Sequence, residues 1–178
     1  YCSDNTRTLP VGGRFTQKQQ EIYEIVLKAN VDAINAAHPG VYNKELHTLS
    51  CKVIAEGLSQ LGLMKGDVDE AVRQGAHALF MPHGLGHQLG LDVHDMEDLG
   101  ENFVGYDDTV SRSDIFGWSA LRMARELKPG FIVTIEPGIY FIPQLTSGRT
   151  SANSSSSSTT TRWSNTATSA VSVSRTTC

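Results

Sequence analysis

Residues 80–95 read FMPHGLGHQLGLDVHD and hold three of the six histidines of this 178-residue chain. His83, His87 and His94 are interleaved there with glycines, and Asp95 follows the last of them. Histidine is the commonest metal-binding side chain, and it carries protons near neutral pH. A single histidine is usually a core or surface residue with a hydrogen bond, but three together indicate a chemical site.

The spacing of the first two histidines allows a helical zinc site, but the residues between them argue against one. His83 and His87 stand four apart and would share one face of a helix. A zinc helix carries a glutamate directly after the first histidine, where this chain has Gly84. Gly84 and Gly86 would each cost a helix roughly 1 kcal/mol. We therefore expect a looped or extended segment, followed by a half-buried strand over the alternating residues 89–95.

Carboxylates come from two other parts of the chain. Residues 128–140 read KPGFIVTIEPGIY, and the β-branched and apolar run 131–135 predicts a strand. Glu136 stands at the end of this strand, where a buried carboxylate is costly unless it is paired or bound to a metal. The alternative is a glutamate that faces solvent. Asp4, within YCSDNTRT at residues 1–8, says little when taken alone.

Four segments resemble the catalytic domain of the proline-specific metalloexopeptidases of the pita-bread fold, aminopeptidase P and prolidase of peptidase family M24. The segments follow the family's order, and the histidine and Glu-Pro-Gly motifs are long and specific. They are SDNTRTLPVGGRFT at 3–16, FMPHGLGHQLGLDVHD at 80–95, LRMARELKPG at 121–130 and TIEPGIYFIP at 134–143. The resemblance implies an α+β pita-bread domain over residues 1–144, incomplete at both ends.

The resemblance also implies a metal site, which in the family holds two ions, usually manganese, on two Asp, one His and two Glu. Asp4 matches the second Asp, which bridges the ions. His87 matches the histidine ligand, and Glu136 matches the first Glu. Such ions activate a shared water as the nucleophile, and a carboxylate beside that water can take its proton.

The same resemblance assigns substrate-binding and catalytic roles. His83 and His94 match histidines that bind the scissile peptide and stabilise its tetrahedral intermediate. Arg122 matches an arginine that pairs, in prolidase, with the terminal carboxylate of the substrate. The alternative for Arg122 is an exposed helix residue. The implied activity is hydrolysis of Xaa-Pro bonds, in which the amide nitrogen carries no hydrogen and proline fixes its own φ.

Two of the five family ligands have no counterpart in this sequence. The first Asp belongs ahead of Asp4, and the last Glu belongs to a motif that resembles Gly-Ile-Arg-Ile-Glu-Asp. We therefore expect a domain truncated at both ends, at most one weakly held metal ion, and little or no peptidase activity.

Residues 145–178 differ from the rest in composition, with 20 Ser or Thr among 34 residues and no Asp or Glu. Such a segment buries too little apolar surface to offset chain entropy and is expected to be disordered, as a linker or mucin-like stalk. A second hypothesis is a frameshift. Back-translation of residues 169–178 (SAVSVSRTTC), shifted by one base, gives Phe-Gly-Gly-Ile-Arg-Ile-Glu-Asp-Asp-Leu. Sequencing of the encoding DNA tests this hypothesis.

The remaining patterns predict an α+β order of elements. Apolar periodicity and end signals predict helices at 16–37, 44–61, 67–78 and 118–127, with a surface loop at 102–114. The net charge of −4 and the pI of about 5.8 give no electrostatic support for nucleic-acid binding. No membrane span and no signal peptide are visible, and three cysteines form no disulfide framework. We expect a cytoplasmic protein that can form homo-oligomers when intact.

Three questions about function stay open at this point. Arg122 favours cleavage of dipeptides, as in prolidase, over release of the first residue from longer peptides. A non-catalytic binding module on the same fold is a second class, although such a module has no need for carboxylates that face an imidazole. A creatinase-like hydrolase of a C–N bond outside peptides is the third.

Overall fold

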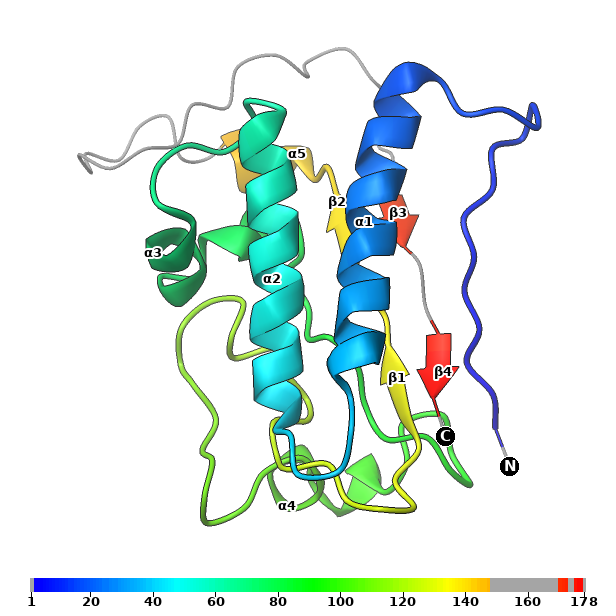
Figure 1. Cartoon of the computed structure of the whole chain (residues 1–178). Coiled ribbons are helices and arrows are strands. Elements are labelled where there is room, and N and C mark those ends of the chain that lie inside the picture. The colour runs from blue at the N-terminus through cyan, green and yellow to red at the C-terminus, as the bar shows by residue number, and fades with distance from the viewer. Residues whose placement is uncertain (1, 148–169, 173–174, 178) are drawn as a thin grey trace.

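The computed structural model describes residues 2–147, 170–172 and 175–177. Two long helices, α1 (Gln17–Ala36) and α2 (Asn43–Gln60), run antiparallel side by side, and short strand pairs lie behind α1 (Figure 1). The other elements are α3 (Val68–Arg73), the 3₁₀ helices η1 (Ala76–Leu79) and η2 (Glu97–Leu99), α4 (Glu101–Val104), β1 (Val133–Ile135), β2 (Gly138–Tyr140), α5 (Pro143–Ser147), β3 (Ala170–Ser172) and β4 (Arg175–Thr177). The α+β class is confirmed.

The first two helices form where the sequence predicts them, within one residue at each end. Thr16 caps α1 through a capping box, because its hydroxyl accepts from the Gln19 N–H and the Gln19 side chain accepts from the Thr16 N–H. Apolar residues three and four apart form the buried face of each helix. In α1 these include Ile22, Val26, Ala29 and Ala33, and in α2 they include Leu46, Ile54 and Leu58.

The hydrophobic core lies between this helix pair and the strands. One cluster joins Val26 and Ile54 of the helices to Ile139 of β2. A second cluster joins Leu46 of α2 to Ile135 of β1. Each fully buried apolar side chain of this size contributes about 1.5–3 kcal/mol, so the helix pair fixes the position of both strands.

Both strands have antiparallel partners from the end of the chain. Strand β1 pairs with β4, with Ile135 opposite Arg175, and β2 pairs with β3, with Ile139 opposite Val171. Residues 148–169 lie outside the described residues, and with them most of the segment that was expected to be disordered, while the frameshift hypothesis concerns the encoding DNA and stays a prediction. Of the described pieces of that tail, β4 lies along β1, which ends next to Glu136, and β3 lies along β2.

The predicted helix at 118–127 is wrong, because its backbone groups bond to the start of α2 instead. The Ala124 and Arg125 carbonyls accept the N–H groups of Lys44 and Asn43. These N–H groups belong to the first turn of α2 and have no partner within their own helix. Apolar residues of the segment 118–127 are buried, but the segment is irregular and not helical.

The predicted strand at 89–95 is also wrong. The segment folds back on itself, because Gly90 N–H donates to the Asp92 carbonyl and Asp95 N–H to the Gln88 carbonyl. Leu89 is buried, but Leu91 and Val93 are exposed, with Leu91 70% accessible. The helix predicted at 67–78 is divided into α3 and η1, because Gly75 between them has a positive φ of 77°. The strand predicted at 131–135 is shorter, and the loop at 102–114 begins inside α4.

Candidate metal centre

The glycine-rich segment is extended where it passes β1, as the sequence predicted. Thr134 N–H donates to the His87 carbonyl at 2.9 Å, and Glu136 N–H donates to the Leu85 carbonyl at 2.8 Å. Gly86 makes this approach possible, since a Cβ built there would lie 2.7 Å from both the carbonyl carbon and Oγ1 of Thr134. The two hydrogen bonds fix His87 beside the end of the strand.

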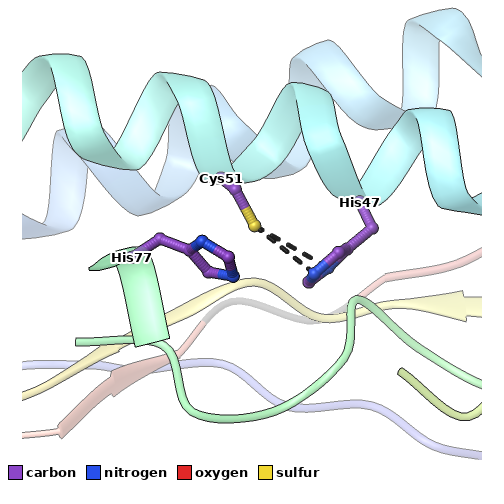
Figure 2. Close-up of side chains that lie close together, drawn as sticks. All are labelled: His47, Cys51 and His77. Atoms are coloured by element: carbon purple, nitrogen blue, oxygen red, sulfur yellow. Dashed lines mark hydrogen bonds between the residues drawn. The ribbon is translucent and has the colours of Figure 1, made fainter. Parts of the chain in front are cut away.

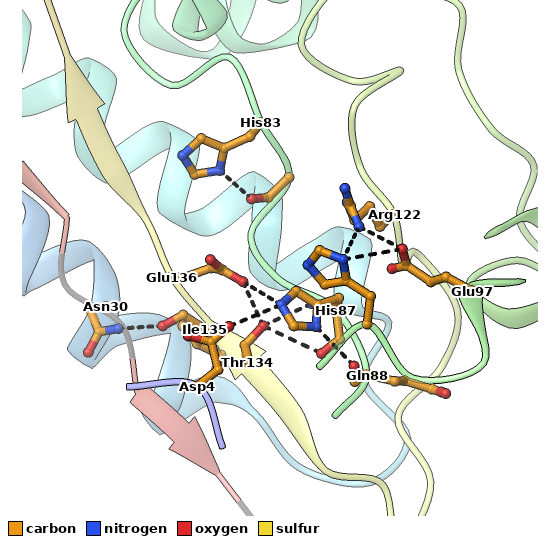
Figure 3. Close-up of polar contacts among 12 residues, drawn as sticks. Asp4, Asn30, His83, His87, Gln88, Glu97, Arg122, Thr134, Ile135 and Glu136 are labelled. Carbon is orange, nitrogen blue, oxygen red and sulfur yellow. Dashed lines mark hydrogen bonds and ion pairs between the residues drawn. The ribbon is translucent and has the colours of Figure 1, made fainter. Parts of the chain in front are cut away.

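Three predicted ligands, Asp4, His87 and Glu136, come together at this point and are called here the carboxylate–histidine centre (Figure 3). His87 Nε2 lies 3.1 Å from Glu136 Oε1 and 3.4 Å from Asp4 Oδ2. One donor atom from each residue lies within 4.8 Å of the other two. His87 is buried and both carboxylates are partly buried, so the group is partly shielded from solvent.

The electrostatics of the centre favour a positive charge between the carboxylates. Burial opposes protonation of His87, but hydrogen bonds to Glu136 and to the Gln88 carbonyl outweigh it and raise the pKa of the imidazole. Burial opposes ionisation of Glu136, but bonds from His87 and Thr134 outweigh it and lower the pKa of the carboxyl. Both shifts have the same cause, because the carboxylates favour a positive charge beside them, as a proton on His87 or a bound cation would supply.

A hydroxyl that the sequence reasoning missed connects two of the ligands. Thr134 Oγ1 donates to Glu136 Oε1 at 2.8 Å and accepts the His87 backbone N–H at 3.0 Å. Thr134 stands two residues before Glu136 in an extended chain, so period-two alternation places both on one face and could have identified it. On the other side, buried Asn30 of α1 donates to the Ile135 carbonyl at 2.8 Å and fixes the strand next to Glu136.

We expect Thr134→Val to lower the affinity for divalent cations about 10–100-fold, because outer partners of metal ligands have effects of that size. The substitution keeps the β-branched shape and removes only the hydroxyl. Titration with Mn²⁺ measures the affinity. Thr48→Val is the matched control, since the Thr48 hydroxyl donates to the Lys44 carbonyl within α2, away from the carboxylate–histidine centre. Equal affinities of the two variants would contradict the role of Thr134.

Two of the predicted substrate-side residues lie beside this centre. The His94 ring stands edge-on to the His87 ring, with 4.4 Å between centroids. Arg122 Nη1 lies 2.9 Å from His94 Nδ1 and donates to Glu97 Oε2 at 2.6 Å. Glu97 was missed by the sequence reasoning, because nothing local connects it to Arg122. Arg122 is in a turning segment and not on a helix, and any anionic ligand would share its guanidinium with Glu97.

His83 stands apart from the three ligands (Figure 3). Its Nδ1 bonds to the Gly84 carbonyl at 2.8 Å, and its ring is edge-on to Tyr140 at 5.2 Å. Its buried Nε2 has no hydrogen-bond partner among the residues that the structure describes. That nitrogen is therefore available to a ligand near Glu136, whose pKa the His83 ring also helps to lower.

The donor set of the centre fits a divalent cation. Two carboxylates and one imidazole offer hard oxygen and borderline nitrogen donors, which suit Mn²⁺ and similar first-row ions. The pair of carboxylates supplies two negative charges when His87 is neutral. A divalent cation that binds His87 Nε2, Asp4 Oδ2 and Glu136 Oε1 would therefore take the place of a proton on His87.

Comparison with known proteins gives one consistent result. Residues 1–167 match metallopeptidase family M24. The chain is 44% identical over 147 residues to the Xaa-Pro dipeptidase of Homo sapiens, which is 82% of this chain and 28% of that protein. It is 40% identical over 143 residues to the Xaa-Pro aminopeptidase of Escherichia coli strain K12, which is 80% of this chain and 28% of that protein.

A solved structure agrees with these matches. Zinc-substituted Escherichia coli aminopeptidase P in complex with product superposes with a TM-score of 0.72 at 33% identity, over 99% of this chain and 32% of that one. This chain thus spans less than a third of the length of these relatives. No helix in its described part has the length and apolar character of a membrane span.

Proposed function

Because this chain belongs to metallopeptidase family M24, we propose that it supplies the metal-binding part of an exopeptidase that hydrolyses Xaa-Pro peptide bonds. The observation that carries the proposal is the convergence of Asp4, His87 and Glu136 from three separate segments. A non-catalytic module has no physical reason to bury an imidazole between two carboxylates.

The proposed cation is Mn²⁺, held by Asp4 Oδ2, His87 Nε2 and Glu136 Oε1, and when bound it supplies Lewis-acid activation of a water molecule. The chain's own contribution is to prepare these ligands. Glu136 is kept ionised, with Oε1 directed by Thr134, so its carboxylate can accept a proton near neutral pH. His87 is held by its backbone bond to Thr134 and by the Gln88 carbonyl on Nδ1 at 2.9 Å, which leaves Nε2 facing the carboxylates.

The substrate would lie on the histidine side of the centre. His83 Nε2 and the half-exposed ring of His94 are the proposed donors to the scissile carbonyl, where negative charge develops. Arg122 is the proposed partner of a terminal carboxylate, and Glu97 holds its guanidinium in place before binding. Glu97 competes with the substrate for the Arg122 guanidinium. A substrate with a free carboxylate therefore gains less binding energy from Arg122 than it would from an arginine without an ion-pair partner.

A chimaera tests the proposed function. Residues 1–144 of this chain would replace the matching segment of the Escherichia coli Xaa-Pro aminopeptidase, to which the chain is 40% identical. With Mn²⁺ added, we expect hydrolysis of Xaa-Pro peptides by this chimaera and a loss of at least 100-fold in kcat when it also carries His87→Ala. A folded chimaera that binds Mn²⁺ but cleaves no Xaa-Pro peptide would overturn the proposal. Its activity on Gly-Pro compared with Gly-Pro-Pro separates the dipeptidase from the aminopeptidase.

A further inference from the structure

A second group of potential ligands lies away from the carboxylate–histidine centre, and it consists of His47, Cys51 and His77 (Figure 2). These three residues are called here the His–Cys cluster. His47 and Cys51 stand four apart on α2 and share one face of that helix. His77 lies on η1, which faces them. All three side chains are fully buried.

The distances in the cluster approach those of a metal site. Cys51 Sγ lies 3.5 Å from His47 Nε2, and one donor atom of each residue lies within 4.8 Å of the other two. In a tetrahedral zinc site with Zn–S near 2.3 Å and Zn–N near 2.0 Å, sulfur and nitrogen ligands stand about 3.5 Å apart. The His47–Cys51 pair already has this separation, and a His77 nitrogen lies within 4.8 Å of both donor atoms.

The nitrogens of His77 also point to a missing partner. Neither ring nitrogen makes a hydrogen bond with any residue that the structure describes. The Val72 carbonyl lies close enough to act weakly on the His77 pKa as a hydrogen-bond acceptor, but the contact does not have hydrogen-bond geometry, and the well-formed bond of this carbonyl is to Trp118 Nε1 at 2.9 Å. A buried imidazole without a partner loses the hydrogen bonds that water would give it. The partner of His47 in the described part is the weakly bonding Cys51 thiol.

Ring packing accounts for only part of this arrangement. The Trp118 indole stands edge-on to both imidazoles, at 5.2 Å from His47 and 5.6 Å from His77. Such contacts stabilise three rings of any kind, and phenylalanines would make them without unpaired nitrogens. Burial lowers the pKa of His47 to about 3 and that of His77 to about 4, so both rings are neutral and keep a lone pair at neutral pH.

We propose that His47, Cys51 and His77 form a second metal site that binds Zn²⁺. A thiolate and two imidazoles are borderline-soft donors that select zinc, whereas the carboxylate–histidine centre has mainly hard oxygen donors. Binding replaces the thiol proton, which leaves to solvent, by a sulfur–metal bond, so the ion and its ligands carry one positive charge. Three protein ligands leave a fourth position, and the bound ion links α2 to η1.

Trp118 contacts both histidines of the cluster. This side chain also lines a groove of about 470 Å³ between α2 and α3, whose walls include Lys44, Val72 and Ile115. Because the indole contacts both imidazoles and the groove, its movement would open the cluster to an ion from solvent. The site is independent of the peptidase proposal, since none of its residues belongs to the carboxylate–histidine centre.

Cobalt titration of the full chain tests the site, because Co²⁺ bound to a thiolate gives a charge-transfer absorption band. The parent for this test carries Cys2→Ser and Cys178→Ser, so that Cys51 is the only thiol, and Glu136→Gln, which weakens the first centre. We expect one equivalent of Co²⁺ to produce the band and one equivalent of Zn²⁺ to remove it. Cys51→Ser should abolish the band, and His77→Gln should weaken Co²⁺ binding at least tenfold.

The controls separate ligation from folding. Ser50→Ala alters the neighbouring buried position on α2, whose hydroxyl bonds to the Ala29 carbonyl, and should keep the band. Circular dichroism checks that each variant is folded. If Cys51→Ser does not fold, Cys51→Ala takes its place in the titration. Zn²⁺ should raise the urea midpoint of the parent and leave that of the Cys51 variant unchanged. A folded parent without the band, or full affinity in both His47→Gln and His77→Gln, would overturn the proposal.

Discussion

Replacement of Gly86 by alanine should remove the affinity of the carboxylate–histidine centre for Mn²⁺ and lower the free energy of unfolding by about 3 kcal/mol. The new Cβ would lie 2.7 Å from both the carbonyl carbon and Oγ1 of Thr134, and these atoms belong to strand backbone and to a buried side chain. The segment has to move away from β1, and overpacking of this kind costs about 1–3 kcal/mol or more.

The same movement explains the loss of metal affinity. His87 is next in the chain, and its carbonyl accepts the Thr134 N–H at 2.9 Å. When the segment is displaced, His87 Nε2 leaves its position 3.1 Å from Glu136 Oε1. We expect at least a 100-fold weaker affinity for Mn²⁺, because a ligand displaced by about 1 Å no longer meets metal–ligand distances that are fixed to about 0.2 Å.

Urea denaturation and Mn²⁺ titration measure the two effects. Gly12→Ala is the matched control, because no atom lies within 4 Å of a Cβ at that position and its φ is not positive. An exposed substitution of this type should change the free energy of unfolding by less than about 0.5 kcal/mol. If Gly86→Ala behaves like Gly12→Ala in both measurements, the close approach of the two segments is not required.

Acidification should destabilise the metal-free chain through the His–Cys cluster. In the unfolded chain both histidines titrate near 6.5, whereas burial lowers the pKa to about 3 in His47 and to about 4 in His77. The unfolded state therefore binds more protons below pH 6.5, and stability is lost as the pH falls from there toward the folded values. Between pH 7.5 and pH 5 the loss is about 2 kcal/mol for each histidine, hence on the order of 4 kcal/mol.

His87 acts with the opposite sign. Because its folded pKa is raised, its contribution to stability is complete below the unfolded pKa and is lost as the pH rises through the folded value. Urea denaturation in the presence of a chelator, at pH 7.5, 6.5 and 5.0, measures the sum. Phenylalanine at position 77 should remove about half of the acid-induced loss, and His87→Asn should increase the loss. An acid-induced loss that is the same in the His77→Phe chain would contradict this account.

The carboxylate–histidine centre shows which site residues could be predicted from the sequence. The histidine-rich segment and Glu136 could be singled out because each has its own local chemistry, one among glycines and one at the end of an apolar strand. The choice of His87 among the three histidines, and of Asp4, came only from the family resemblance. Thr134 shares a strand face with Glu136, so the alternation of side chains along a strand could have predicted its position. The contact of Glu97 with Arg122 could not be predicted in this way, because the two residues stand 25 positions apart in the sequence.

The errors in secondary structure have a common cause. Residues 118–127 and 89–95 have the apolar spacing of a helix and of a strand, but their backbone groups bond to α2 in one case and to their own segment in the other. Apolar spacing reports which residues avoid water, and it does not report which backbone partner a segment finds. The same limit hid the His–Cys cluster, because the spacing of His47 and Cys51 is visible in the sequence while the position of His77 is not.

By itself, the sequence determined the two long helices, excluded a helical course for the glycine-rich segment, and indicated the motifs that hold the candidate ligands His87 and Glu136. These features depend on interactions between residues a few positions apart, which periodicity and end signals describe directly. Only the tertiary structure decided that Thr134 joins His87 to Glu136, that Glu97 holds Arg122, and that three buried side chains meet under Trp118. Such contacts join residues far apart in the chain, and they exist only because packing of the helix pair against the strands brings those segments together.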